Sequence, residues 1–168
     1  MAACSGAATS LPDPMKSLTE ADRQTIKATW AVLFGNAEEN GRLIFVRFFT
    51  DYPDSKAYFK TIPTEGDLLR NRELAFHGRR VMVALDHMIA SLSNQPRLCT
   101  LIGRLAESHR DKHGVPVKMF QLLFQAMLNV FQDLLGEDFT RDSMASWQKF
   151  FEALHEEFQA TYITRPRF

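Results

Sequence analysis

Apolar residues recur at helical spacing along almost the whole chain, and this periodicity constrains the fold most strongly. No segment shows sustained period-two alternation bounded by hairpin turns, and no internal repeat occurs at a fixed period. The sequence therefore predicts an all-α protein. The most regular apolar stripe has steps of seven, four, three and four residues, which places one helix over about residues 71–92. The residues of this stripe are Leu74, Val81, Leu85, Met88 and Leu92.

Other segments predict further helices, for a total of six or seven. Ser17 and Glu20 form a capping-box pattern that starts the first helix. The dense apolar run within residues 36–52 is predicted as a buried helix rather than a strand, because a long polar lead precedes it. Residues 60–70 are predicted to be a connection, and three further helical segments follow Pro96.

The length of the chain, 168 residues, supports one domain with a substantial core. Residues 1–16 are small and polar, contain two prolines, and are predicted to form a flexible arm. We expect the folded domain to span residues 17–163 and a short tail to occupy residues 164–168.

The balance of charges limits the kinds of partner. Twenty Lys and Arg residues stand against 20 Asp and Glu residues, which gives a formal net charge of zero. This balance lacks the basic footprint of nucleic-acid binding, and no apolar stretch approaches the roughly 20 residues that span a bilayer. We therefore expect neither nucleic-acid binding nor stable membrane insertion.

The aromatic and cysteine content indicates a dry interior and a reducing compartment. Fourteen residues are Phe, which carries no polar group and suits a core or an apolar ligand pocket. Cys4 and Cys99 are the only cysteines, and their separation fits neither a disulfide scaffold nor a thiolate metal site. No signal peptide or myristoylation signal is apparent at the N-terminus, so we expect a cytoplasmic protein.

Two of the five histidines fall on apolar helical faces. His77 lies three residues after Leu74 and four before Val81, and His109 lies four residues after Leu105. Burying an imidazole without a partner costs roughly 1–3 kcal/mol. Each ring therefore requires a hydrogen-bond partner or a metal.

The residues alone leave two interpretations of these histidines open. Each can be a core histidine that is hydrogen-bonded to a carbonyl group, as most buried polar side chains are. Alternatively, imidazoles from facing helices can ligate haem iron axially, while the porphyrin supplies the other ligands. No cysteine or carboxylate cluster offers a tetrahedral zinc site, and the motifs of nucleotide-binding proteins, serine hydrolases, zinc proteases and di-iron bundles are absent.

Three segments together resemble the globin family. They are PDSKAYF, HGRRVMVAL and LAESHRDKHGVP, in this order and spacing, and the similarity extends over about residues 17–162. The interval of 32 residues between His77 and His109, and Arg80 three residues after His77, are most similar to cytoglobins and related vertebrate-type globins. The resemblance implies a globin fold of six to eight helices around a pocket for haem b, iron protoporphyrin IX.

The resemblance also implies roles for individual residues. His109 matches the proximal iron ligand and His77 the distal histidine, and the carbonyl of Leu105 would accept the other N–H of the His109 ring. Phe45 and Val81 match positions beside the bound gas. Arg80 and His113 match positions that reach the haem propionates. The other implied haem contacts are Phe59, Leu85, Val115, Phe120 and Leu123.

The chain departs from many cytoglobins at two kinds of position. Ala37 and Arg79 stand where those proteins carry the cysteines of an internal disulfide, so redox switching through that bridge is not expected. Phe45 stands where many relatives carry Leu, and we expect the larger ring to alter gas access and affinity.

Three hypotheses about function follow. The first is a globin that binds dioxygen reversibly for storage, transport or sensing, takes CO and NO as further ligands, and has His77 either as hydrogen-bond donor to the gas or as sixth iron ligand. The second is a haem redox enzyme, such as a nitric oxide dioxygenase or nitrite reductase, or an electron-transfer protein. The third is a helical interaction module without haem. We expect a monomer or a homodimer.

Overall fold

The computed structural model describes residues 13–164 of the chain. Within that part it contains six α-helices, three short 3-10 helices and no β-strand, so the predicted all-α class is confirmed. The α-helices are α1 (Glu20–Phe34), α2 (Ala37–Asp51), α3 (Arg72–Ala90), α4 (Gln95–Asp111), α5 (Lys118–Leu135) and α6 (Arg141–Thr164). The 3-10 helices are η1 (Pro53–Tyr58), η2 (Leu68–Arg70) and η3 (Gly136–Asp138).

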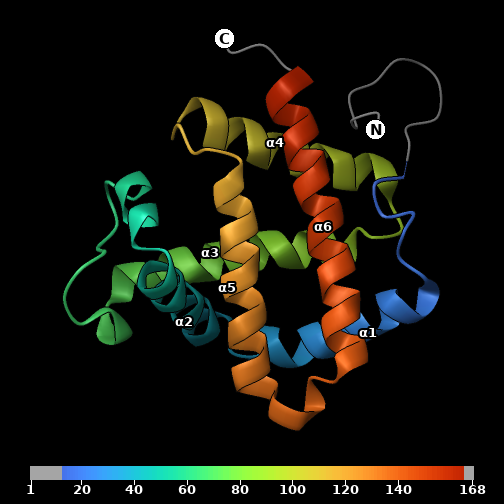
Figure 1. Cartoon of the computed structure of the whole chain (residues 1–168), viewed down its shortest axis with the longest axis horizontal. Coiled ribbons are helices and arrows are strands. Elements are labelled where there is room, and N and C mark those ends of the chain that lie inside the picture. Colours follow the sequence, from blue (N-terminus) through green and yellow to red (C-terminus); the bar gives the residue numbers. More distant parts are fainter. Residues whose placement is uncertain (1–12, 165–168) are drawn as a thin grey trace.

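The helices cross one another in two layers (Figure 1). In that view α5 and α6 run antiparallel in front, α2 lies beside α5, and α1, α3 and α4 pass behind them. α2 packs on both α3 and α5, and α4 packs on α6. This arrangement brings α2, α3, the end of α4 and the start of α5 together around one region of the fold.

Thr19 caps α1, two residues beyond the predicted start. The N–H of Asp22 donates to Thr19 Oγ1 at 3.1 Å, and the Asp22 carboxylate accepts the Thr19 N–H at 2.9 Å. The pattern of Ser17 and Glu20 has the same spacing, so the sequence offers two overlapping capping boxes. The predicted cap at Ser17 is wrong because the Asp22 carboxylate also accepts hydrogen bonds from α6, which favours the second box.

The chain joins the fold earlier than predicted. Met15 is fully buried, and the Arg23 guanidinium donates to the carbonyl oxygens of Met15 at 3.0 Å and Leu92 at 2.7 Å. Met15 therefore packs with the folded part of the chain, although it precedes residue 17, where we expect the domain to begin. Residues 1–12, with Cys4, and residues 165–168 of the predicted tail lie outside the described residues.

Aromatic rings fill the core between α1, α5 and α6. Trp147 is fully buried, and the ring centroids of Trp30 and Phe131 lie 6.0 and 5.0 Å from its own. Both indole N–H groups are paired, that of Trp30 with Asp86 at 2.9 Å and that of Trp147 with Thr29 at 2.8 Å. The core therefore gains large apolar surfaces without leaving these donors unsatisfied.

Gly41 of α2 and Gly78 of α3 mark a very close approach of two helix backbones. A Cβ atom added at Gly78 would lie 2.3 Å from the carbonyl carbon of Gly41, and one added at Gly41 would lie 2.4 Å from that of Gly78. Only the absence of both side chains permits this crossing. Phe45 follows Gly41 by one helical turn and His77 directly precedes Gly78, so the crossing also positions these two rings.

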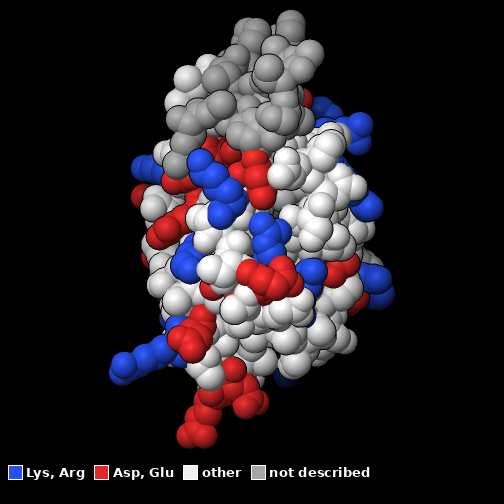
Figure 2. All heavy atoms as spheres, turned by 90° about the vertical axis from the view of Figure 1, so that its right-hand side faces the viewer, with Lys and Arg blue, Asp and Glu red and all other residues white. Residues whose placement is uncertain are grey.

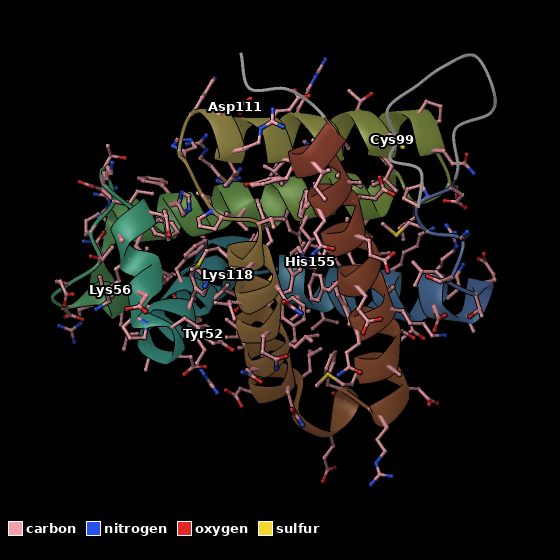
Figure 3. All side chains as sticks on the ribbon, turned by 45° about the horizontal axis from the view of Figure 1, so that its top comes forward. Tyr52, Lys56, Cys99, Asp111, Lys118 and His155 are labelled. Carbon is pink, nitrogen blue, oxygen red and sulfur yellow. The ribbon has the colours of Figure 1, made fainter. Side chains whose placement is uncertain are left out.

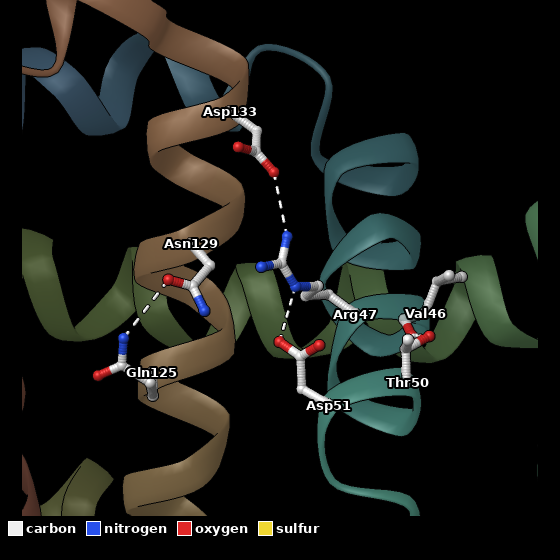
Figure 4. A network of polar contacts seen from close by, with 7 residues as sticks. All are labelled: Val46, Arg47, Thr50, Asp51, Gln125, Asn129 and Asp133. Carbon is white, nitrogen blue, oxygen red and sulfur yellow. Dashed lines mark hydrogen bonds and ion pairs between the residues drawn. The ribbon is translucent and has the colours of Figure 1, made fainter.

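Charged side chains on the described surface are mixed in sign. Arg47 of α2 donates to Asp51 at 2.7 Å and to Asp133 of α5 at 3.2 Å, which links the two helices (Figure 4). On the face in Figure 2, positive and negative side chains are interspersed. Exposed pairs of this kind contribute only about 0–1 kcal/mol each. Among the described helices, none has the length and apolar character needed to cross a bilayer.

We predict that Gly78→Ala lowers the free energy of unfolding by about 3 kcal/mol, the upper part of the range for overpacking. The new methyl group meets the backbone of α2, which cannot move aside as a flexible side chain can. Chemical denaturation measures the change. Gly35→Ala serves as the milder control, since Gly35 is exposed, has right-handed helical backbone angles, and an added Cβ would lie 3.2 Å from the Val32 carbonyl oxygen rather than inside another helix backbone. A loss below about 1 kcal/mol for Gly78→Ala would contradict the tight crossing.

A second prediction concerns the ionised carboxylate of Asp22, which joins α1 to α6. It accepts the Ser146 hydroxyl at 2.7 Å and the Lys149 ammonium at 2.9 Å. The Ser146 hydrogen bond, followed by that of the Thr19 N–H, holds the pKa of Asp22 well below its usual range, against the opposing effect of burial. The resulting stabilisation is present above the pKa of an unfolded Asp, about 3.9, and is lost as pH falls through the folded-state pKa.

Asp22→Asn is therefore expected to be less stable than the wild type near neutral pH, and this difference should shrink below about pH 4. Denaturation curves collected from neutral to acidic pH measure it. Asp138→Asn, at an exposed position in η3, is the control for the loss of one carboxylate. A constant difference between Asp22→Asn and wild type across the same pH range would refute the assignment.

Candidate functional site

A cavity of about 330 Å³ lies where α2, η1, α3, the corner between α4 and α5, and the start of α5 meet. Its volume is in the range of cofactor and small-molecule sites. Most of its walls are aromatic or aliphatic, and none of the described residues that line it carries a carboxylate. The lining residues are Phe45, Phe48, Ser55, Tyr58, Phe59, Lys60, Thr61, Ile62, His77, Val81, His109, Lys112, His113, Val115, Met119, Phe120 and Leu123.

The structure gathers most of the predicted pocket residues around this cavity. Arg80 is exposed, although its charge acts on His77. Leu85 packs in the main core because it follows His77 by eight residues, which turns it about 80° around the helix. Leu105 lines a second cavity. The nine predicted residues on the wall are Phe45, Phe59, His77, Val81, His109, His113, Val115, Phe120 and Leu123.

His77 of α3 is held between aromatic rings. Its ring centroid lies 4.7 Å from that of Phe45 and 5.6 Å from that of Phe59, both in edge-to-face contacts. Burial lowers the pKa of His77 to about 4, and the positive charge of Arg80 adds to this effect. The ring is therefore neutral near pH 7, with one N–H donor and one nitrogen lone pair.

His109 of α4 is oriented by its own helix. Its Nδ1 lies 2.8 Å from the carbonyl oxygen of Leu105, one turn earlier, as the sequence led us to expect. A carbonyl only accepts, so Nδ1 carries the proton and Nε2 keeps its lone pair. Burial lowers the pKa of His109, and the Leu105 hydrogen bond opposes that shift. The ring of Phe120, 5.2 Å away between centroids, packs against it.

The corner between α4 and α5 is fastened by α6. The Tyr162 hydroxyl donates to the carbonyl oxygen of Val115 at 2.8 Å, and the Val115 N–H donates to the carbonyl oxygen of His109 at 3.0 Å. Burial raises the pKa of Tyr162 to about 12, so this donor stays protonated at neutral pH. Val115 and His109 are thereby held at fixed places in the cavity wall.

Apart from the histidines, the polar residues that line the cavity were not predicted from the sequence. Lys60 and Thr61 follow Phe59, and Lys112 precedes His113. Because each is next to a predicted lining residue, the sequence could have indicated that they lie at the cavity. Ser55 gave no such signal. Its side chain is buried in η1, and its hydroxyl has no hydrogen-bond partner. The other missed lining residues are Phe48, Tyr58, Ile62 and Met119.

A second cavity of about 260 Å³ lies between α3 and α4. Ala84 and Met88 belong to the same helical stripe of α3 as His77 and Val81, since they follow His77 by seven and eleven residues. The second cavity therefore lies along the same side of α3 as the first, closer to the α3–α4 turn. The second cavity is lined by Ala84, His87, Met88, Leu101, Arg104, Leu105 and Ser108.

A sequence model of the family described as Globin matches residues 42–158, more than half of the chain. The chain belongs to the globin family. It is 29% identical to cytoglobin-2 of Danio rerio over 154 residues, which cover 90% of this chain and 84% of that protein. It is 31% identical to a globin of Nerita albicilla over 144 residues, covering 84% of this chain and 91% of the relative. Cytoglobin-1 of Danio rerio is 29% identical over 150 residues, with coverages of 87% and 86%.

The expected resemblance to cytoglobins is thus confirmed, and membership of the globin family implies a haem-binding protein. The residues of this globin fit such a group. His109 offers Nε2 from one wall and His77 offers a neutral ring from another, while Phe45, Phe59 and Phe120 provide apolar contacts. Among the described residues no cluster of three or more His, Cys, Asp or Glu side chains could hold a metal ion.

Proposed function

We propose that this globin binds haem b in the first cavity, which His77 and His109 line, and uses it to bind dioxygen reversibly. The observation that carries the proposal is the pair of neutral imidazoles, His77 and His109, that line one aromatic cavity without a carboxylate. When bound, haem supplies the iron that takes up a diatomic gas. The protein supplies the ligand, the hydrogen bond and the exclusion of water.

His109 is proposed as the protein ligand of the iron through Nε2. Its Nδ1–H group is engaged by the Leu105 carbonyl, which fixes the tautomer and increases the basicity of Nε2. Phe120 packs against the ring, so together with the Leu105 hydrogen bond it limits rotation of the imidazole, while the Val115 N–H holds the backbone of His109 in place. A preoriented ligand loses less entropy when it binds the metal.

His77 is proposed to act on the gas position. A neutral imidazole can donate its N–H to a gas that carries partial negative charge, and it can instead offer its lone pair as a sixth ligand. In the second case, gas affinity falls with the fraction of time that the position is occupied by His77. Phe45 contacts the ring edge-to-face at 4.7 Å, so its size limits the orientations that His77 can adopt.

The polar residues at the cavity rim are proposed to hold the haem propionates. Lys60, Lys112 and His113 are exposed residues of the lining, and Arg80 lies near His77 on α3. Charge-assisted hydrogen bonds from such groups stabilise carboxylates. Long Lys and Arg side chains keep their charges in water while their stems cover the apolar edge of a ligand.

We predict that the purified protein binds one equivalent of haem with a Soret band, and that His109→Leu loses this binding or the associated spectrum. The reason is that His109 supplies the obligatory bond to iron, while the cavity wall supplies only apolar contact. His155→Leu, in α6 and outside both cavities, is the control and should titrate like the wild type. A wild type without a Soret band after reconstitution would sink the proposal and favour a haem-free interaction module.

We further predict that His77→Leu changes the ferrous protein. If His77 ligates the iron, the visible bands of the deoxy form are split in the wild type and the splitting disappears in the variant. If His77 donates a hydrogen bond, dioxygen dissociates at least ~10-fold faster, because a hydrogen bond to a charged group is worth about 1.5–3 kcal/mol.

The matched control for this variant is His155→Leu, since His155 is a half-buried histidine of α6 that does not line the cavity. It should leave both the spectrum and the dissociation rate unchanged. A His77→Leu protein with wild-type ferrous bands and a wild-type dissociation rate would remove His77 from the gas site. Steady turnover of nitric oxide with a reductant would favour a redox enzyme over a dioxygen carrier.

A further inference from the structure

Arg110 is a buried cation next to the proposed iron ligand. It follows His109 directly in α4, and its side chain is only 5% exposed. A guanidinium removed from water is tolerated only when its N–H groups are paired. The residue lines neither cavity, so the proposed haem site does not by itself explain why a charge is buried here.

The guanidinium bonds to α4 and α6 at once. Its Nε and Nη2 donate to the two carboxylate oxygens of Asp111 at 2.6 and 2.9 Å, which orients the planar group as a fork. Its Nη1 donates to the carbonyl oxygen of Thr161 in α6 at 3.0 Å. Figure 3 shows Asp111 at the end of α4, near the C-terminal part of α6.

These bonds act on the turn of α4 that determines the position of His109. α4 ends at Asp111, and the last turn of a helix tends to fray because its carbonyl groups lack intrahelical partners. The hydrogen bond between His109 Nδ1 and the Leu105 carbonyl requires this turn to remain helical, since it spans four residues. Fastening Arg110 to α6 therefore also holds the His109 ring in line with its acceptor.

We propose that Arg110 is a positioning residue that sets the strength of the bond between His109 and the haem iron, through the α4–α6 link. This inference rests on the proposed function, since it takes His109 as the iron ligand. Arg110 does not touch the ligand site. It acts by keeping the Nδ1–H group on the Leu105 carbonyl, and that hydrogen bond raises the basicity of Nε2.

The test uses the ferrous deoxy protein with His77→Leu, so that His109 is the only proposed protein ligand. In this background Arg110→Met removes the N–H fork but keeps an unbranched apolar stem, and Arg110→Lys keeps the charge without the fork. Arg97→Met is the matched control, because Arg97 is an exposed arginine near the other end of α4. Resonance Raman spectroscopy measures the iron–histidine stretching frequency, and transfer of haem to an excess of an acceptor apoglobin measures haem loss.

We expect Arg110→Met to lower the stretching frequency and to accelerate haem loss by roughly 10-fold, the lower end of the effect of losing an outer partner of a metal ligand. Arg110→Lys should be intermediate, and Arg97→Met should match the parent. A purely structural role would accelerate haem loss without moving the frequency, so an unchanged frequency in both Arg110 variants overturns the inference.

A parent protein that does not bind haem would instead overturn the proposed function, and the two failures are therefore distinguishable. If Arg110→Met does not fold, Arg110→Lys carries the test. In that variant hydrogen exchange of the haem-bound protein should show faster exchange across residues 108–112 than in Arg97→Met. Equal exchange rates together with an equal stretching frequency would exclude the positioning role.

Discussion

The contact between the backbones of Gly41 and Gly78 determines where the rest of the site lies. With no side chain at either position, α2 and α3 cross closely enough for each backbone to exclude even a methyl group from the other. Phe45 stands one turn along α2 from the crossing and His77 stands beside it on α3. Their edge-to-face contact at 4.7 Å therefore follows from the crossing, and the aromatic wall of the cavity is built around that pair.

The proximal side depends on a different physical device, the satisfaction of polar groups. His109 has its Nδ1 on the Leu105 carbonyl, and the carbonyl of His109 accepts the Val115 N–H. α6 then contributes to both ends of the corner, since the Tyr162 hydroxyl bonds Val115 and the Thr161 carbonyl accepts from Arg110. A stable corner keeps one imidazole nitrogen available to a ligand, while burial keeps the ring neutral. The chain has no net charge, so the electrostatics of this site come from nearby groups and not from an overall charge of the protein.

Much of this fold could be predicted from the sequence because its periodicity is unusually regular. Asn71 precedes the stripe of α3 by three residues, and it caps that helix through the Leu74 N–H at 3.0 Å. The start of α1 was harder, since Ser17 and Thr19 head overlapping patterns, and only a tertiary partner, Ser146 of α6, distinguishes them. The burial of Met15 was also harder to predict, because the Arg23 side chain that bonds its carbonyl group is held in turn by Leu92, a residue distant in the sequence.

The residues of the candidate site also differ in whether the sequence predicts their positions. Residues on a helical stripe, such as His77 and Val81, could be predicted to line the cavity. Leu85 lies on the same apolar face of α3, but it is turned far enough around the helix from His77 that its side chain packs in the core instead. Ser55, a buried hydroxyl in a short 3-10 helix, has no periodic signature at all. Arg110 lies in the charged segment SHRDKH, and its burial depends on how α6 packs on α4, which helical periodicity does not reveal.

The central claim is that His109 binds haem iron inside this cavity while its Nδ1 stays on the Leu105 carbonyl. A crystal structure of the ferric, haem-bound protein tests it most directly. We expect iron bonded to Nε2 of His109, with the Leu105 hydrogen bond retained and the macrocycle between α3 and α4. Iron ligated by another histidine instead of His109, or a haem group bound outside the space between these helices, would contradict it.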